Sequence, residues 1–200
     1  NVQVFGLEVD PVMIEYVRKR FDSTPPQNWR VGDMKELDLV FPDRVGQFDS
    51  VLCIGNTLPH CKSIAEVHQT VAAMLKLLKP DNGVLILQTV NYDRVIKHKI
   101  SSLPLITNTT PTGVSFTFTR SYDISGLPNS VLFKTLLQTS DGTVNIVGEH
   151  TLLALTKDQM VQAVEQAGGK VVEIIGTFAG ETWNADNSPS TVIVIKKQQI

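Results

Sequence analysis

Two carboxylates stand where apolar segments end, and their positions suit a nucleotide-like ligand. Glu8 closes the apolar run of residues 2–9, and Asp33 comes one residue after the short strand expected at 29–31. A carboxylate at a strand end can accept hydrogen bonds from both hydroxyls of a ribose, and a second acid can accept from an adenine amino group. Either residue could instead be a solvated acid at a strand end or the cap of a following helix.

Two further polar segments follow apolar runs in the same way. Asn56 and His60 lie in the loop 55–61 after the run 48–54, and Asn91 and Tyr92 follow the run 84–90. These amide, imidazole and phenol groups could orient a small polar substrate. Asn56 and Asn91 could equally be turn residues, and His60 could be a structural histidine. The functional interpretation depends on all four polar segments following strand ends.

The first 90 residues predict strands alternating with amphipathic helices. Asp10 as N-cap and Pro11 at the first helical position begin one helix, and Ser63 with Glu66 forms a capping box before another. The strands expected at 2–9, 29–31, 48–54 and 84–90 are nearly all apolar. This pattern predicts an α/β fold of the Rossmann-like, doubly wound kind, with a mostly parallel sheet covered on both faces.

The second half of the chain changes to antiparallel patterns. Apolar and polar residues alternate from 114 to 122, and further strands are expected at 131–138 and 144–154, so residues 114–154 form a β-meander inserted into the domain. A helix begins after Thr156 and ends at Gly168. No helix fits between the strands expected at 171–178 and 191–196, so they should form a terminal antiparallel hairpin.

Composition is that of one α/β domain of 200 residues, with 42% hydrophobic residues and a formal net charge of −2. The absence of a basic stripe gives no support for nucleic-acid binding. Cys53 and Cys61 do not form a zinc motif, and the histidines are scattered, so no metal site is expected. No apolar run is long enough to span a membrane, and two cysteines suggest a reducing, cytoplasmic setting.

Several segments resemble the motifs of class I S-adenosylmethionine-dependent methyltransferases. The segment 4–11 (VFGLEVDP) is similar to the second-strand signature, and 31–34 (VGDM) to the adenine-contacting motif. The segment 48–60 (FDSVLCIGNTLPH) resembles the fourth-strand motif, and 77–86 (LLKPDNGVLI) the run leading into the fifth strand. GNTLPH and the Asn91-Tyr-Asp triplet are especially similar to glycine/sarcosine N-methyltransferases. The resemblance covers nearly the whole chain.

This resemblance implies a function and a set of site residues. The expected reaction is methyl transfer from S-adenosylmethionine to a small-molecule acceptor, with an amine nitrogen as the target. The cofactor would be bound by Glu8, Val9, Asp33, Met34, Ile54 and Gly55, and the acceptor by Asn56, His60, Asn91, Tyr92 and Trp183. The aromatic residues of the meander, with Trp183, would enclose a pocket roofed by residues 114–154. No catalytic base is assigned, the reaction requires no metal, and a homo-oligomer is left open.

The sequence departs from this family at its start. The family's Gly-rich motif after the first strand would precede Glu8, so we expect the chain to lack the N-terminal part of a methyltransferase domain and to be incompetent by itself. The strands at 2–9 and 48–54 would then flank a gap about 10 Å wide where a central strand is missing. Such a gap should not persist, so either upstream residues fill it or the sheet has closed up differently. Two alternatives remain open. They are a nicotinamide-dependent Rossmann oxidoreductase and a catalytically inactive methyltransferase-like binding domain.

Overall fold

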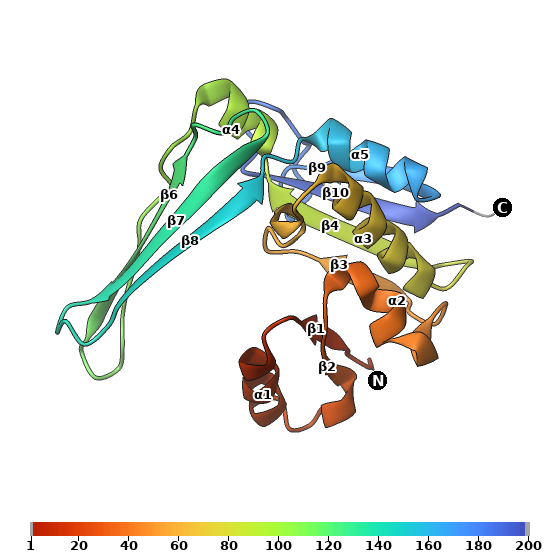
Figure 1. The fold of residues 1–200 in the computed structure, drawn as a ribbon, viewed down its shortest axis with the longest axis horizontal. Helices are drawn as coiled ribbons and strands as arrows, with labels where there is room; N and C mark the ends of the chain where they lie inside the picture. The colour runs from red at the N-terminus through yellow and green to blue at the C-terminus, as the bar shows by residue number, and fades with distance from the viewer. Residues whose placement is uncertain (1, 199–200) are drawn as a thin grey trace.

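The N-terminal module of the fold is a βαβ unit. In the computed structural model, which describes residues 2–198, β1 (Gly6–Glu8) pairs in parallel with β2 (Trp29–Val31), and α1 (Pro11–Arg20) connects them (Figure 1). The side chain of Asp10 accepts the backbone N–H of Val12 and caps α1, as the sequence predicted. Glu8 therefore lies at the carboxyl end of β1, directly before this helix.

A second sheet contains the central strands of the domain. Its strand order is β3-β4-β10-β9, with bounds β3 (Ser50–Cys53), β4 (Val84–Val90), β9 (Gly169–Ile175) and β10 (Ser190–Lys197). β3 and β4 are parallel, whereas β10 is antiparallel to both of its neighbours. The terminal antiparallel hairpin expected from the sequence is confirmed, because the connection 176–189 contains no crossover helix.

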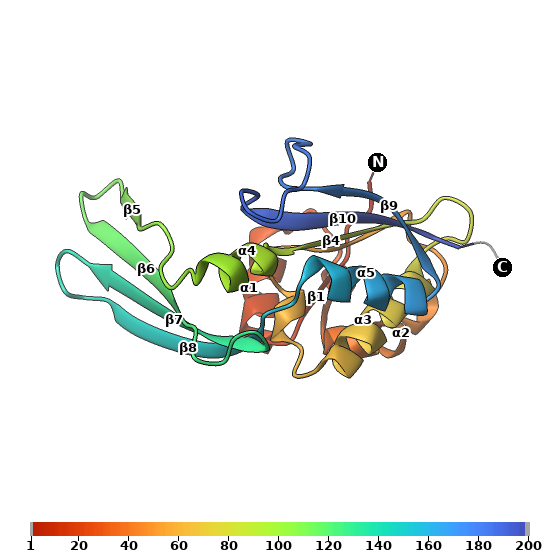
Figure 2. The ribbon, with the colours of Figure 1, turned by 90° about the horizontal axis from the view of Figure 1, so that it is seen from above.

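Three helices lie against one face of this second sheet (Figure 2). They are α2 (Leu37–Val40), α3 (Ile64–Leu77) and α5 (Lys157–Gln166). Thr156 and Gln159 form a complete capping box at α5, whereas Glu66 at α3 bonds to the N–H of Lys62 instead of closing its box with Ser63. Burial in β4 alternates along the strand, so its second face is less covered than the near-continuous apolar sequence suggested.

The hydrophobic core lies between these helices and the sheet. Its most buried side chains are less than about 1% exposed and point into the helix–sheet interface. They are Val67, Val71, Leu78, Leu85, Leu87, Met160, Val164, Ile193 and Ile195. Fully burying side chains of this kind stabilises a fold by about 1.5–3 kcal/mol each. This rigid layer fixes the carboxyl ends of β3 and β4, where the polar loops begin.

The β1-β2 pair and the second sheet are not joined by strand pairing among the described residues. A slot of about 460 Å³ lies between β1 and β3, and its walls include Phe5, Leu7, Val51 and Cys53. Leu52 on β3 remains 60% exposed, which is unusual for an apolar residue in the middle of a domain. The slot therefore separates β1 from β3, the two strands between which a further strand was expected.

The antiparallel insertion forms a long four-stranded sheet that projects from the body (Figure 1). Its order is β5 (Ile106–Thr109), β6 (Ser115–Asp123), β7 (Ser130–Thr139) and β8 (Asn145–Leu153). The last three strands match the predicted meander, but β5 was missed because its exposed threonines and asparagine carry no alternating apolar pattern. The meander therefore begins before the predicted boundary at 114.

One helix was also missed. The sequence analysis predicted no helix after the strand at 84–90, but α4 (Tyr92–His98) begins there, with Asn91 as its N-cap. Four short elements complete the assignment, the 3-10 turns η1 (Pro26–Asn28), η2 (Met34–Glu36), η3 (Pro42–Arg44) and η4 (Leu58–His60). A seven-residue helix has too few turns for its periodicity to be recognised, so α4 could not be separated from a turn.

Candidate functional site

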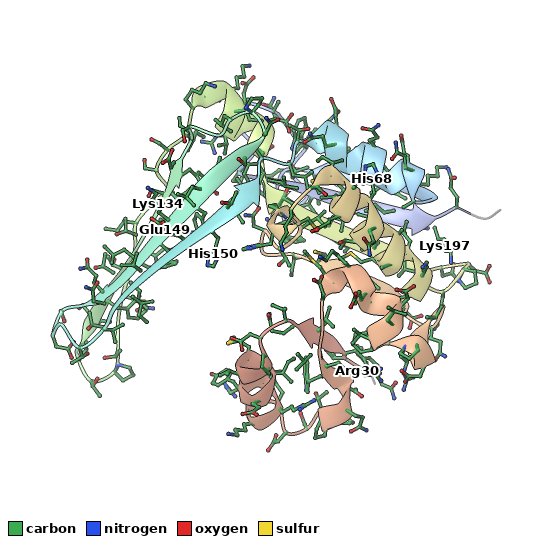
Figure 3. All side chains as sticks on the ribbon, in the orientation of Figure 1. Arg30, His68, Lys134, Glu149, His150 and Lys197 are labelled. Carbon is green, nitrogen blue, oxygen red and sulfur yellow. The ribbon has the colours of Figure 1, made fainter. Side chains whose placement is uncertain are left out.

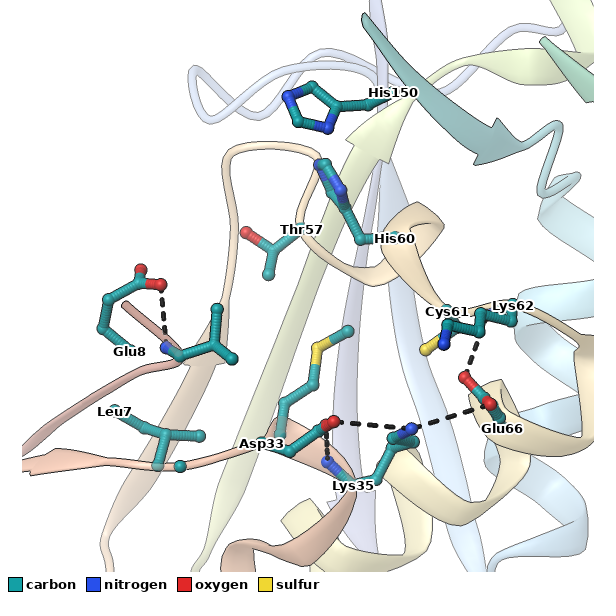
Figure 4. Close-up of a pocket in the computed structure, with 13 residues that line it drawn as sticks. Leu7, Glu8, Asp33, Lys35, Thr57, His60, Cys61, Lys62, Glu66 and His150 are labelled. Carbon is teal, nitrogen blue, oxygen red and sulfur yellow. Dashed lines mark hydrogen bonds and ion pairs between the residues drawn. The ribbon is translucent and has the colours of Figure 1, made fainter. Parts of the chain in front are cut away.

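A pocket of about 580 Å³ opens where β1 and β2 end, beside η4 and the start of α3 (Figure 4). The residues that line it come from five separate parts of the chain: Leu7, Glu8, Val9, Gly32, Asp33, Met34, Lys35, Thr57, His60, Cys61, Lys62, Glu66 and His150. Its size is within the range of small-molecule sites, and its walls combine apolar and charged groups. Five of the predicted site residues, Glu8, Val9, Asp33, Met34 and His60, are brought together here.

Glu8 has one carboxylate oxygen in internal bonds and one without a partner. Its Oε1 accepts the backbone N–H groups of Val9 at 2.8 Å and Asp10 at 3.1 Å. No hydrogen bond to Oε2 is present among residues 2–198. The two backbone bonds hold the side chain in place, while Oε2 keeps acceptor capacity for a ligand's hydroxyl groups.

Asp33 begins a charged chain across the floor of the pocket. It caps η2 by accepting the backbone N–H of Lys35, and its Oδ2 lies 3.4 Å from Lys35 Nζ. Lys35 Nζ also lies 3.6 Å from Glu66 Oε1 on α3, as Figure 4 shows. The two acids raise the pKa of Lys35, and the largest cause is the interaction in which its ammonium group donates to the Asp33 carboxylate. Asp33 therefore caps η2, which was one of the two roles considered for it. Its carboxylate also lines the pocket and keeps lone pairs that can accept hydrogen bonds from a ligand.

Two histidines face each other at the rim of the pocket. His60 ends η4, and His150 lies on β8 of the meander, with 5.8 Å between the ring centroids and an interplanar angle of 63°. Partial burial is the first cause that lowers the pKa of His60, and the charge of His150 is the second. The pair is therefore the place where the meander meets the site, and His150 is a residue that sequence reasoning did not select.

Asn56 and Tyr92 belong to an internal hydrogen-bond network behind this rim. Asn56 adopts a left-handed backbone with φ of 64°, its Oδ1 accepts the N–H of Val90, and its Nδ2 donates to Tyr92 Oη at 3.1 Å. Tyr92 is fully buried, and its ring lies beside that of Tyr122 on β6, with 6.5 Å between the ring centroids. Burial raises the pKa of both phenols, so they remain protonated at neutral pH.

Asn91 and Trp183 lie outside the pocket lining. The Asn91 amide is 1% exposed and donates to the carbonyls of Asn184, Ala185 and Ser188, which fastens the loop between β9 and β10. The Trp183 indole donates to Thr191 Oγ1 at 2.9 Å. Acceptor contacts by these two residues and by Asn56 and Tyr92 stay predictions, although their polar groups already have protein partners.

The last two predicted cofactor residues lie at the end of β3. Ile54 lines the slot between β1 and β3 rather than the pocket. Gly55 has a φ of 76°, which favours glycine, and its N–H donates to Gln88 Oε1 at 2.6 Å. A Cβ at Gly55 would meet open space, so this glycine is needed for its backbone conformation and not for close packing.

Several pocket residues were not predicted, because nothing in the sequence around them indicates a functional site. Lys35, Thr57, Lys62 and Glu66 carry no motif by themselves. His150 had a detectable signal, since it has the same parity as Leu152 in an alternating strand and so should point toward the body. The alternate positions Lys134 and Glu149 lie on the opposite face of the meander (Figure 3).

Comparisons with known proteins point to methyltransferases. A family model described as a methyltransferase domain matches residues 1–81, which include β1, β2, β3 and all of α3. The glycine/sarcosine/dimethylglycine N-methyltransferase of Actinopolyspora halophila is 27% identical over 161 residues, which is 76% of this chain and 25% of that protein. These matches support a class I S-adenosylmethionine-dependent methyltransferase. The pocket of this methyltransferase domain is therefore its candidate cofactor site.

Further relatives place limits on the likeness. The glycine/sarcosine N-methyltransferase of Halorhodospira halochloris is 35% identical, but only over 57 residues, which is 28% of this chain and 21% of that protein. The chain thus spans about a quarter or less of the length of these two curated relatives. The shared segment supports the methyltransferase family, whereas the relatives' substrates are those of longer proteins.

Solved structures support the fold. A methyltransferase from Clostridium acetobutylicum matches with a TM-score of 0.78 at 12% identity, over 99% of this chain and 76% of that one. An amino pentose methyltransferase from Micromonospora echinaspora, solved with bound S-adenosylmethionine, matches with a TM-score of 0.71 at 21% identity, over 98% and 74% of the two chains. At these identities the likeness is one of fold, and it includes the meander and the terminal hairpin.

Two kinds of feature are not found within residues 2–198. No group of three or more histidine, cysteine, aspartate or glutamate side chains is arranged to hold a metal ion in this part of the chain. Likewise, no helix within this part of the chain is long and apolar enough to cross a membrane.

Burial raises the pKa of the Cys53 thiol to about 12, so this cysteine is a core residue and not a reactive thiolate.

Proposed function

We propose that this protein transfers the methyl group of S-adenosylmethionine to a nitrogen atom of a small-molecule amine. The observation that carries the proposal is the pocket itself, in which the Glu8 and Asp33 carboxylates, the apolar side chains of Leu7, Val9 and Met34, and the His60 imidazole converge. Glycine and sarcosine appear in the names of the curated relatives, and an amino pentose in the name of one structural neighbour. These names favour a nitrogen acceptor.

The residues fit the cofactor by the chemistry of their donors and acceptors. Glu8 Oε2 would accept the ribose hydroxyls, and Asp33 would accept the adenine amino group between the Leu7 and Met34 side chains. The bound cofactor supplies a methyl group that is already activated on a sulfonium. The protein's own task is then to hold an uncharged nitrogen in line with that methyl and to exclude water, for which proximity and orientation contribute several kcal/mol.

The acceptor would enter beside the meander. β8 contacts η4, so the body-facing side of the meander forms a wall next to His60. The buried Tyr92–Tyr122 contact behind it, at 6.5 Å between ring centroids, keeps this wall fixed to α4. This wall suits a small molecule better than a long polymer, because side chains of β8 and η4 converge on the site from two sides.

A screen with labelled S-adenosylmethionine tests this proposal. Glycine, sarcosine and an amino sugar are offered in parallel with tRNA and with a lysine-containing peptide, and the labelled product is identified by mass spectrometry. We expect an N-methylated small molecule. Transfer to RNA or to the peptide, with none to small amines, contradicts the acceptor class. Binding of the cofactor without transfer to any acceptor supports a methyltransferase-like binding domain instead.

We also propose that one further strand belongs in the slot between β1 and β3. Neighbouring strands lie about 4.8 Å apart, so one inserted strand would pair with both open edges. It would cover Leu52 and bring backbone N–H groups to the pocket, which lies beside the slot and shares Leu7, Glu8, Met34 and Thr57 with it. Amide hydrogen exchange on the full-length protein tests this. Protection of slot-facing amides in β1 and β3 is expected, and rapid exchange of those amides contradicts it.

A further inference from the structure

Among the described residues, no hydrogen-bond or ion-pair partner explains why the side chains of His60 and His150 face each other at the rim of the pocket. No hydrogen bond or ion pair of the His60 or His150 side chain to another residue is present within residues 2–198. By contrast, His98 on the surface bonds to Asp186 at 2.9 Å. Both rim rings are exposed toward the pocket, and Figure 4 shows them facing each other above Thr57. Polar groups that lack internal partners at a pocket rim are available to a ligand.

The position of the pair is set by rigid elements on both sides. His60 follows the buried residues Leu58 and Pro59 in η4. His150 is directly opposite Phe133 in the β7–β8 register, and Phe133 is opposite Tyr122, so these three side chains form one row on the body-facing side of the meander. Tyr122 and Leu152 are buried against the body. The imidazole distance is therefore determined by core packing and not by loop conformation.

The surroundings of the His60–His150 pair favour a state in which only one of the two rings carries an extra proton. Two positive rings with centroids 5.8 Å apart repel each other, so protonation of one disfavours protonation of the other. Lys35 is neutralised by Asp33 and Glu66. The titratable groups that face the pair, or lie on elements packed against it, come from β1, η2, α3, α4 and the meander: Glu8, Asp33, Lys35, Lys62, Glu66, Tyr92, Tyr122, Lys134 and Glu149.

We propose that His60 and His150 together accept the proton of the acceptor's ammonium group, with His150 as the second half of this site. The inference rests on the proposed function and deepens it by assigning the proton acceptor. In the step, an N–H bond of the ammonium breaks and its electron pair stays on nitrogen, which becomes the nucleophile. The proton passes to the unprotonated ring nitrogen of one imidazole and leaves to bulk water after the reaction. Charge is conserved, and the step needs no further reactant.

The pKa values are consistent with this role. Burial and the neighbouring ring lower the pKa of His60, so at pH 7 this imidazole is largely neutral and can receive a proton. Neither buried tyrosine can substitute as a base, because burial keeps both phenols protonated. The pocket carboxylates at Glu8 and Asp33 are on the side proposed for the ribose and adenine, and both already accept backbone N–H groups.

The first test is a pH profile of kcat/KM for sarcosine with the variants His60→Gln, His150→Gln and the double variant, and His98→Gln as the matched control. General acid–base catalysis contributes about 10²–10⁴-fold, so the double variant should lose about 100-fold at pH 7. The loss should shrink toward pH 10, where the amine arrives without its proton. A deficit that is the same at every pH overturns the proposal, since it would indicate a steric effect. Wild-type kcat/KM in the double variant also overturns it.

The second test does not depend on turnover. Histidine ring resonances are followed by NMR from pH 5 to 9 in the wild-type protein and in the two single variants. We expect His150→Gln to raise the pKa of His60, because the repulsion between the rings is removed. Unchanged titration curves overturn the coupling. If this coupling is found but no amine is methylated by the wild type, the proposed function fails while the pair itself stands.

Discussion

Replacing Glu8 should weaken S-adenosylmethionine binding by an amount that the structure sets. Its Oε1 already accepts two backbone N–H groups, at 2.8 and 3.1 Å, so only Oε2 is available to the ribose. A hydrogen bond to a charged group contributes about 1.5–3 kcal/mol, and every 1.4 kcal/mol is a tenfold change in affinity. Since Glu8 is exposed, the lower part of this range applies. Glu8→Ala should therefore raise Kd by about 10- to 30-fold.

The assay is isothermal titration of S-adenosylmethionine into the full-length protein. Glu8→Gln keeps an acceptor for the N–H groups of Val9 and Asp10 but removes the charge, so its Kd should rise less than that of Glu8→Ala. Glu15→Gln on the exposed side of α1 is the matched control and should bind as the wild type does. Melting temperatures of all variants show whether the fold is retained. A Kd within twofold of the wild type for both Glu8 variants refutes the assignment of the ribose to Glu8.

Three further changes have defined outcomes. Asp33→Asn keeps the cap of η2 but weakens the contact with Lys35. The Kd for S-adenosylmethionine should rise by about three- to tenfold in the same titration, and an unchanged Kd would contradict a contact to adenine. Asn91→Ala removes buried amide bonds and the α4 cap, so urea denaturation should show a loss of about 2–4 kcal/mol, whereas an unchanged unfolding free energy would contradict its structural role. The pKa of His60 in the folded protein lies below 6.5, so the unfolded chain binds this proton more readily and stability should fall as pH drops through about 6.5 toward the folded pKa. His60→Gln should flatten that part of the pH–stability curve, and an identical slope in the variant would contradict the shift.

The elements that the sequence predicted well are those with strong local signals. Asp10-Pro11 begins α1, Thr156 and Gln159 cap α5, and β4 occupies residues 84–90 as expected. These features depend on residues within one turn or one strand of each other. The terminal antiparallel hairpin was also predictable, because the segment between β9 and β10 is too irregular for a crossover helix.

The remaining features depend on contacts between distant parts of the chain. Asn91 looked like a substrate ligand because it follows a strand, but its amide is fully used by a loop more than ninety residues away. His150 was set aside as a scattered histidine, because its neighbour His60 lies in a different half of the sequence. Strand-end position correctly predicted that Glu8 and Asp33 lie at one pocket, since the carboxyl ends of parallel strands share one edge of a sheet, whereas their contacts with a cofactor stay predictions.

The proposed function requires that the pocket formed by β1, β2 and η4 binds S-adenosylmethionine for transfer to a small amine. Its most direct test is a single-turnover experiment, in which full-length protein is mixed with methyl-labelled S-adenosylmethionine and sarcosine and the labelled product is separated. We predict labelled N-methylated amine together with S-adenosylhomocysteine in equal amounts, and a strong reduction of both in Glu8→Ala. Label that stays in the cofactor with every small amine tested would contradict the account.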